Sequence, residues 1–141
     1  MRENNSLRTI SVVGGLELKD VFIGRSEIND CRGNPYYFFV FNATKDIFVS
    51  QQMLSGARWE EQLNHLLHHL IKISKKDTED INILDVGANL GAFSLYASSL
   101  GCRVYSFEMQ PDIYTLLEMS RRIIMIVRQH LMQLSLMLKD K

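Results

Sequence analysis

The sequence predicts an α/β fold, and three features of its hydrophobic pattern support this class. Short apolar runs bounded by Gly, Pro, Asn and Asp in the first third indicate strands. Apolar residues at spacings of three and four over residues 58–74 indicate an amphipathic helix. From residue 81 onward a strand, a helix and a second strand follow with short connections, which predicts a β-α-β unit with parallel strands. A long apolar helix is expected at the C-terminal end.

Residues 1–57 form the predicted β-rich N-terminal region. Residues 9–13 and 16–23, separated by a Gly-Gly pair, predict one hairpin, and residues 36–41 and 46–50 predict a second one. We find no catalytic signature in this region.

A second region, residues 58–141, begins with the amphipathic helix and a charged turn that together cover residues 58–80. One stripe of the helix is apolar and contains Trp59, Leu63, Leu66, Leu67, Leu70 and Ile71. The opposite stripe contains Glu61, His65, His68, His69 and Lys72. His65 and His69 are one helical turn apart, a spacing that can bind a metal, but no second ligand cluster lies nearby in the sequence. A solvated face is therefore the favoured interpretation, and no metal site is predicted.

Residues 81–120 contain the β-α-β unit. The pattern predicts a strand over residues 81–86, a helix over 90–100 and a second strand over 103–108. Pro111 then begins another helix, at a position where its missing N–H is not needed.

The turn between the first strand and the helix, residues 85–91, reads DVGANLG. Gly87 lets the backbone turn sharply and lets a ligand approach it closely. Asn89 tolerates left-handed geometry and can cap the following helix. Gly91 leaves room between the helix and a ligand or between the helix and a strand. The N–H groups at the start of the helix favour an anionic group such as a carboxylate.

Glu108 ends the second strand, 21 residues (108 − 87) after Gly87. An acidic residue at this spacing is placed to accept hydrogen bonds from the two ribose hydroxyls of a nucleoside. The turn has the spacing G-x-x-x-G instead of the dinucleotide pattern G-x-G-x-x-G, and Asp85 precedes it. A carboxylate there suits a ligand with a cationic amino group, so S-adenosylmethionine (SAM) is favoured over a nicotinamide or flavin dinucleotide.

The stretch ILDVGANLGAFSLYA at residues 83–97, followed by VYSFE at 104–108 and by Pro111, resembles the FkbM family of SAM-dependent methyltransferases. The family pattern is DVGAN-x-G-x-[FY]-[ST], followed by Gly-x-x-Val and Phe-Glu-Pro-x-Pro. Met109 departs from it, because the family usually has proline there; the change affects the stiffness of the loop more than its chemistry. The resemblance implies a class I, Rossmann-like fold and an O-methyl transfer to a small-molecule or sugar-like acceptor.

By this resemblance the cofactor-binding residues are Asp85, Gly87, Ala88, Asn89, Gly91 and Glu108. Asp85 would lie near the amino group of SAM, Glu108 would hold the ribose, and the four turn residues would line the methionine end. No catalytic residue is assigned. His65 and Tyr114 are candidates for a general base, but nothing in the sequence places either one near the methyl group.

Residues 121–141 diverge from the family pattern. A helix is expected over residues 121–139, with one stripe formed by Ile123, Val127, Leu131, Leu134 and Leu138. It could bind a partner or self-associate, lie at a membrane interface, or be a non-native tail from alternative splicing or a faulty gene model, and the last is favoured. We therefore expect an incomplete Rossmann-like methyltransferase fold that stops after the second motif strand. The alternative function is a non-catalytic truncated isoform or pseudoenzyme that acts as an interaction module.

The composition of the chain disfavours several other classes of protein. Sixteen Lys and Arg balance sixteen Asp and Glu, which disfavours a nucleic-acid partner. No uncharged run approaches 18 apolar residues, so no transmembrane segment is expected. Two cysteines without a CxxC pair suggest a reduced, cytoplasmic compartment.

Overall fold

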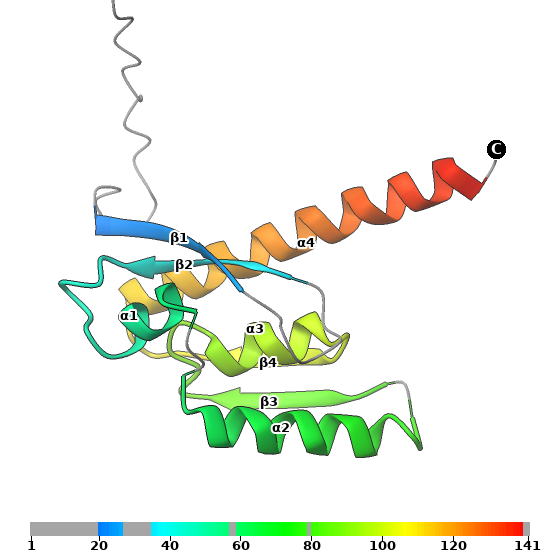
Figure 1. The fold of residues 1–141 in the computed structure, drawn as a ribbon, viewed down its shortest axis with the longest axis horizontal. Coiled ribbons are helices and arrows are strands. Elements are labelled where there is room, and N and C mark those ends of the chain that lie inside the picture. The colour runs from blue at the N-terminus through cyan, green and yellow to red at the C-terminus, as the bar shows by residue number, and fades with distance from the viewer. Residues whose placement is uncertain (1–19, 27–34, 57–58, 79, 140–141) are drawn as a thin grey trace, which may run out of the picture.

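The structure, a computed structural model, describes residues 20–26, 35–56, 59–78 and 80–139. The described elements are, in order, β1 (Val21–Arg25), β2 (Tyr37–Phe41), α1 (Val49–Leu54), α2 (Glu61–Ser74), β3 (Asn82–Val86), α3 (Ala92–Ser99), β4 (Arg103–Phe107) and α4 (Pro111–Lys139). The strands form two separate pairs, β1–β2 and β3–β4, so the described chain is a mixed α/β fold with small sheets. In Figure 1, α4 runs beside the β1–β2 pair, and α2 lies at the opposite side of the molecule.

The N-terminal strands pair differently from the prediction. β1 and β2 are antiparallel, with Val21 opposite Phe41 and Gly24 opposite Phe38. Gly24 is needed there, because a Cβ would lie 2.2 Å from the Phe38 ring. The expected pairing of 36–41 with 46–50 is therefore wrong, and residues 9–13 lie outside the described part of the chain.

Residues 46–50 are not a strand because Asp46 stabilises the start of α1 instead. Its carboxylate accepts the N–H groups of Phe48, Val49 and Ser50 at 3.2, 3.1 and 2.8 Å and the Ser50 hydroxyl at 2.6 Å. Burial opposes ionisation of Asp46, but these hydrogen bonds outweigh it and lower the pKa of the carboxyl. Local side-chain bonding to the backbone has overridden the β-forming composition of this segment.

α4 is one continuous helix of 29 residues, where the sequence predicted a first helix from Pro111 and a second over 121–139. It packs on β2 through Ser120, whose hydroxyl is fully buried. The Ser120 Oγ accepts the Phe39 N–H at 2.8 Å and donates to the Leu116 carbonyl at 2.8 Å. The main core lies along this junction and includes Phe38, Val40, Val49, Met53, Ala88, Leu90, Leu95, Leu116, Leu117 and Ile124.

The expected apolar character of residues 121–139 is not confirmed. Arg121, Arg122, Gln129 and His130 are exposed on this part of α4, so the described side chains mix charged, polar and apolar groups. Among the described residues, no helix combines the length and the hydropathy that a membrane crossing requires.

The β-α-β unit matches its predicted bounds within two residues. β3 and β4 are parallel, with Asp85 opposite Ser106. α2 packs on α3, and Ile71 of α2 is buried together with Ala97 and Cys102.

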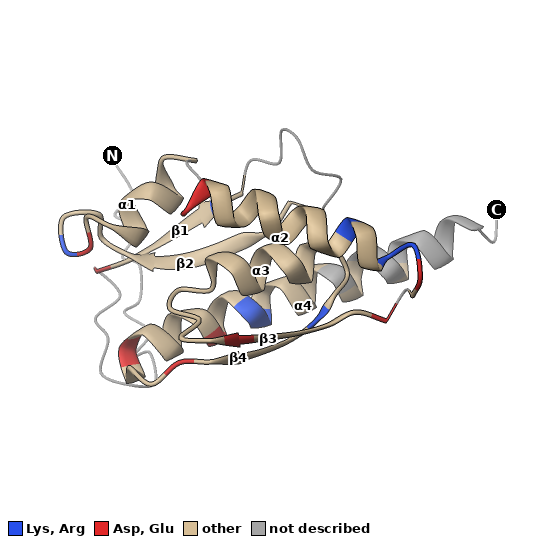
Figure 2. Cartoon of the chain, turned by 90° about the horizontal axis from the view of Figure 1, so that it is seen from below, with Lys and Arg blue, Asp and Glu red and all other residues tan. Residues whose placement is uncertain are grey.

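The predicted apolar stripe of α2 is only partly buried. Leu63, Leu66 and Leu70 are 49%, 53% and 52% exposed. On the stripe expected to be solvated, the ring of His68 instead lies 2.9 Å (Nδ1 to Oη) from the buried Tyr96. Figure 2 shows the charged residues of α2 near its two ends.

Candidate functional site

The turn between β3 and α3 has the left-handed backbone that its sequence predicts. The φ angles are +78° at Gly87, +51° at Asn89 and +88° at Gly91. Asn is one of the few residues other than Gly that adopt this region readily, so each of these residue types suits its position.

Hydrogen bonds fasten this turn to the end of β4. The N–H groups of Gly87 and Ala88 both donate to the Phe107 carbonyl at 2.9 Å. The Asn89 N–H donates to Glu108 Oε2 at 2.8 Å, and the Gln110 N–H donates to Glu108 Oε1 at 2.8 Å. Glu108 therefore lies directly beside the glycine turn, although 19 residues separate it from Asn89.

The surroundings of Glu108 favour its ionised form. The hydrogen bond from the Gln110 N–H is the largest cause of a lowered pKa, burial opposes it, and the N–H groups of Asn89 and Met109 lower the pKa further. A carboxylate has about four lone-pair sites, and the hydrogen bonds from the Asn89 and Gln110 N–H groups occupy one on each oxygen. Glu108 is thus a fixed anion with unused acceptor capacity at the edge of the turn.

The two glycines of the turn differ in what surrounds them. A Cβ on Gly87 would meet nothing within 4 Å, so the backbone there borders open space. A Cβ on Gly91 would lie 2.4 Å from Leu117 Cδ1 and 3.1 Å from Leu95 Cγ. The sequence assigned the space beside Gly91 to a ligand or to a strand, but Leu117 of α4 occupies it. Gly91 instead allows α4 to pack closely on the start of α3.

Ala88 and Asn89 also take structural positions. Ala88 is 5% exposed and belongs to the core. Asn89 Oδ1 accepts the N–H of Leu90 at 2.7 Å, one residue before the α3 N-cap at Gly91, and α3 has no side-chain cap. The expected capping of the helix by Asn89 is therefore not observed.

Asp85 takes part in a polar network that the sequence analysis missed. The Ser94 hydroxyl of α3 donates to Asp85 Oδ2 at 2.5 Å, and Ser94 Oγ and Ser106 Oγ lie 2.6 Å apart. The signal in the sequence was one serine in the α3 segment and one in the β4 segment, Ser94 and Ser106, on the same side of their elements as apolar residues. This network holds Asp85 on the helix side of the sheet.

The two candidate general bases are on different elements. His65 of α2 lies 3.6 Å from Glu61, and both side chains are largely exposed. Tyr114 of α4 lines a cavity that also contains Ser94 and Ser106. Within the described ranges, no group of three His, Cys, Asp or Glu side chains lies close enough together to hold a metal ion.

No protein-family model matches this chain, and no curated protein and no solved structure matches it either. The resemblance to the FkbM family therefore depends on the motif residues alone, and the geometry of the turn is the independent observation that bears on it.

Proposed function

We propose that this chain is a SAM-binding domain of the FkbM methyltransferase type, with O-methyl transfer to a small-molecule or sugar-like acceptor in the cytoplasm as the activity it serves. The observation that carries the proposal is the position of the Glu108 carboxylate beside the open backbone of Gly87. Gly87 follows β3 and Glu108 follows β4. The carboxylate suits the sugar of a nucleoside, and the open backbone suits its amino-acid tail.

The donor set fits SAM better than a dinucleotide. Glu108 would accept the ribose hydroxyls, and the open side of Gly87 would admit the methionine end. Asp85 would attract the ammonium group, with Ser94 fixing its orientation through their 2.5 Å hydrogen bond. Met109, 95% exposed beside Glu108, offers an apolar surface for the adenine. When bound, SAM would supply the electrophilic methyl group. Ala88 and Gly91 act through packing in this proposal.

The experiment is a calorimetric titration of the purified chain with SAM, compared between two glycine variants. Gly87→Leu and Gly101→Leu place the same side chain at similar positive φ angles, +78° and +91°, at opposite ends of α3. Their backbone strain should be alike, about 1–2 kcal/mol each. We expect SAM binding with a micromolar dissociation constant, lost in Gly87→Leu and kept in Gly101→Leu.

A second pair of variants tests the carboxylate. Glu108→Gln keeps the shape of the side chain but removes its charge, and should weaken SAM binding about tenfold or more. Asp112→Asn, an exposed carboxylate in the first turn of α4, should change nothing. Equal binding by Gly87→Leu and the unmodified chain, or no binding by a well-folded sample, would contradict the proposal.

A second candidate function is a non-catalytic interaction module that associates through α4. Its supporting observation is that Met125 and Ile126 of α4 are 56% and 54% exposed. A contiguous exposed apolar patch can mark a contact surface. Self-association of the chain through these residues is one form of this candidate, and binding of a different protein partner is the other.

A further inference from the structure

A cavity of about 430 Å³ lies between α3, β4 and α4, apart from the open side of Gly87. It exists because α4 packs on β2 and leaves space between itself and β4. Cavities of roughly 300–1,000 Å³ with apolar walls and a few polar groups are typical of small-molecule sites. The cavity has two polar ends of different character.

The inner end is a hydrogen-bond acceptor. The single hydroxyl proton of Ser94 is donated to the Asp85 carboxylate, so the 2.6 Å contact between the two serines must use the proton of Ser106. Ser106 Oγ therefore has no proton left and presents lone pairs to the cavity. With the negative charge of Asp85 behind it, this end favours a ligand group that donates a hydrogen bond.

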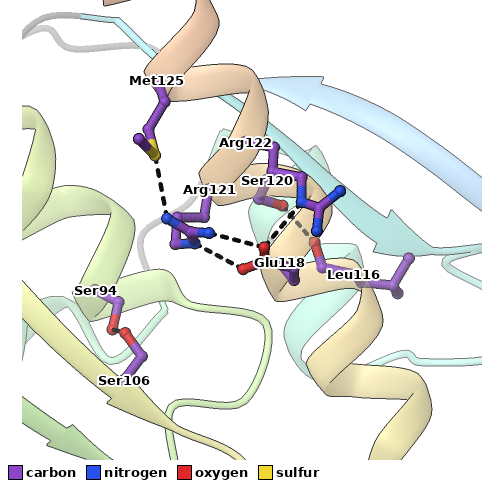
Figure 3. Close-up of polar contacts among 8 residues, drawn as sticks. All are labelled: Ser94, Ser106, Leu116, Glu118, Ser120, Arg121, Arg122 and Met125. Carbon is purple, nitrogen blue, oxygen red and sulfur yellow. Dashed lines mark hydrogen bonds and ion pairs between the residues drawn. The ribbon is translucent and has the colours of Figure 1, made fainter.

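The outer end is cationic. Glu118 accepts two hydrogen bonds from Arg121, at 2.6 Å from Nε and 2.8 Å from Nη2, and one from Arg122 Nε at 2.9 Å. Figure 3 shows both arginines gathered on this one carboxylate, with the Ser94–Ser106 pair on the other side of the view. Glu118 and Arg121 both line the cavity, and Arg122, which lies outside it, adds a second positive charge to the pair. Arg121, which lines the cavity, still has N–H groups to offer after its contact with Met125.

Apolar side chains line the cavity between these ends, together with Ser98. Leu95, Leu117 and Ile124 line the cavity and are 3%, 5% and 7% exposed, so these side chains belong to the core of the molecule. Tyr114 and Met125 line its outer part and are 50% and 56% exposed. A flat apolar body would bury its faces against these side chains.

We propose that this cavity binds a small aromatic carboxylic acid with a phenolic hydroxyl, the hydroxyl donating to Ser106 and the carboxylate facing Arg121. Such a molecule has a hydroxyl, an aromatic ring and a carboxylate. They follow the same order as the acceptor at the inner end, the apolar side chains and the cation at the outer end. Binding here needs no SAM, so the inference stands apart from the proposed function.

The probe is 3-(4-hydroxyphenyl)propionate, titrated into the isotopically labelled chain without SAM and followed by nuclear magnetic resonance. Its amide lacks the charge, and 3-phenylpropionate lacks the hydroxyl. We expect a dissociation constant of about 1 mM or tighter for the acid, with shifts centred on α3 and α4. The amide should bind about tenfold more weakly and 3-phenylpropionate about fivefold more weakly.

Two arginine variants provide the matched comparison, because both arginines bind Glu118 but only Arg121 lines the cavity. Arg121→Gln should abolish the preference for the acid over its amide, whereas Arg122→Gln should retain it. Ser106→Ala should abolish the preference for the hydroxylated ring, and it tests the other end if Arg121→Gln fails to fold. Equal affinity of the unmodified chain for acid and amide, equal effects of the two arginine variants, or no saturation below about 10 mM would overturn the proposal.

Discussion

At the scale of single residues, three carboxylates stabilise local structure, and each does so through different contacts. Asp46 accepts the N–H groups at the start of α1, Glu108 joins the glycine turn to the end of β4, and Glu118 pairs with two arginines on its own helix. In all three the pKa is lowered. Ionised carboxylates are therefore part of the folded state at neutral pH.

Glu118 gives the clearest dependence of stability on pH. Hydrogen bonding from Arg121 is the largest cause that lowers its pKa from 4.5 to about 2, against burial, with Arg122 adding to the effect. Because the folded pKa is below the unfolded one, the stabilisation is complete above pH 4.5 and is lost as the pH falls toward 2. Glu118→Gln should lower the stability at pH 7 by about 1 kcal/mol. The difference from the unmodified chain should shrink between pH 4.5 and 2.

Thermal unfolding followed by circular dichroism at a series of pH values measures this difference. Glu61→Gln is the control, because the Glu61 side chain on α2 is 71% exposed. It should change the melting temperature little at any pH. A Glu118→Gln effect that stays constant down to pH 2 would show that the ion pairs do not stabilise the fold.

Residue types with a local role could be assigned from the sequence, and residues with a distant contact could not. The left-handed backbone at Gly87 and Asn89 follows from turn chemistry within a few residues. The need for glycine at position 91 depends on Leu117, and the orientation of Asp85 depends on Ser94 and the strand opposite. These contacts depend on how distant segments pack together, and a single sequence does not show that packing.

Among the elements, the β-α-β unit was predictable because its hydrophobic period changes within a short stretch of chain. The pairing of the N-terminal strands was not predictable. β1 and β2 are connected through residues 27–34, and the segment expected to pair with β2 leads into α1 instead. The apolar stripe of α2 was predicted, but Leu66 and Leu70 on this stripe are about half exposed. Periodicity indicates the face of a helix that is apolar, not whether another element covers it.

Ser120 connects two elements that are far apart in the sequence. Its buried hydroxyl is the acceptor for the Phe39 N–H of β2, so Ser120→Ala would leave that donor without its partner. The expected cost is about 1–3 kcal/mol in the free energy of unfolding. Thr115→Ala is the control, because Thr115 Oγ1 donates to a carbonyl of α4 itself and joins no other element. Urea denaturation measures both variants, and equal effects would contradict the role assigned to Ser120.

At the scale of the whole molecule, the described part of the chain contains two strand pairs, which α3 and α4 connect through the main core. Parallel strands are usually covered on both faces, yet the face of β3–β4 turned away from α3 is exposed at Leu84, Val86, Tyr105 and Phe107. The sequence predicted that these residues are in strands but not that they are exposed. The hydrophobic period and the composition of an apolar strand are the same whether or not another element covers it. Two apolar surfaces therefore compete as sites of association, this face and the exposed part of α4.

Self-association through α4 predicts a specific response to charge. Ile126→Asp places a carboxylate among the apolar groups of α4 and should return the chain to a monomer, because burying an unpaired charge is costly. Val86→Asp makes the same change on the sheet face, where Val86 is 75% exposed, and should leave association through α4 intact. Gln129→Asp controls for charge alone on an exposed position of α4. Sedimentation velocity over a hundredfold range of concentration distinguishes the outcomes. The reverse pattern would assign association to the sheet, and a monomer at every concentration would contradict self-association through α4.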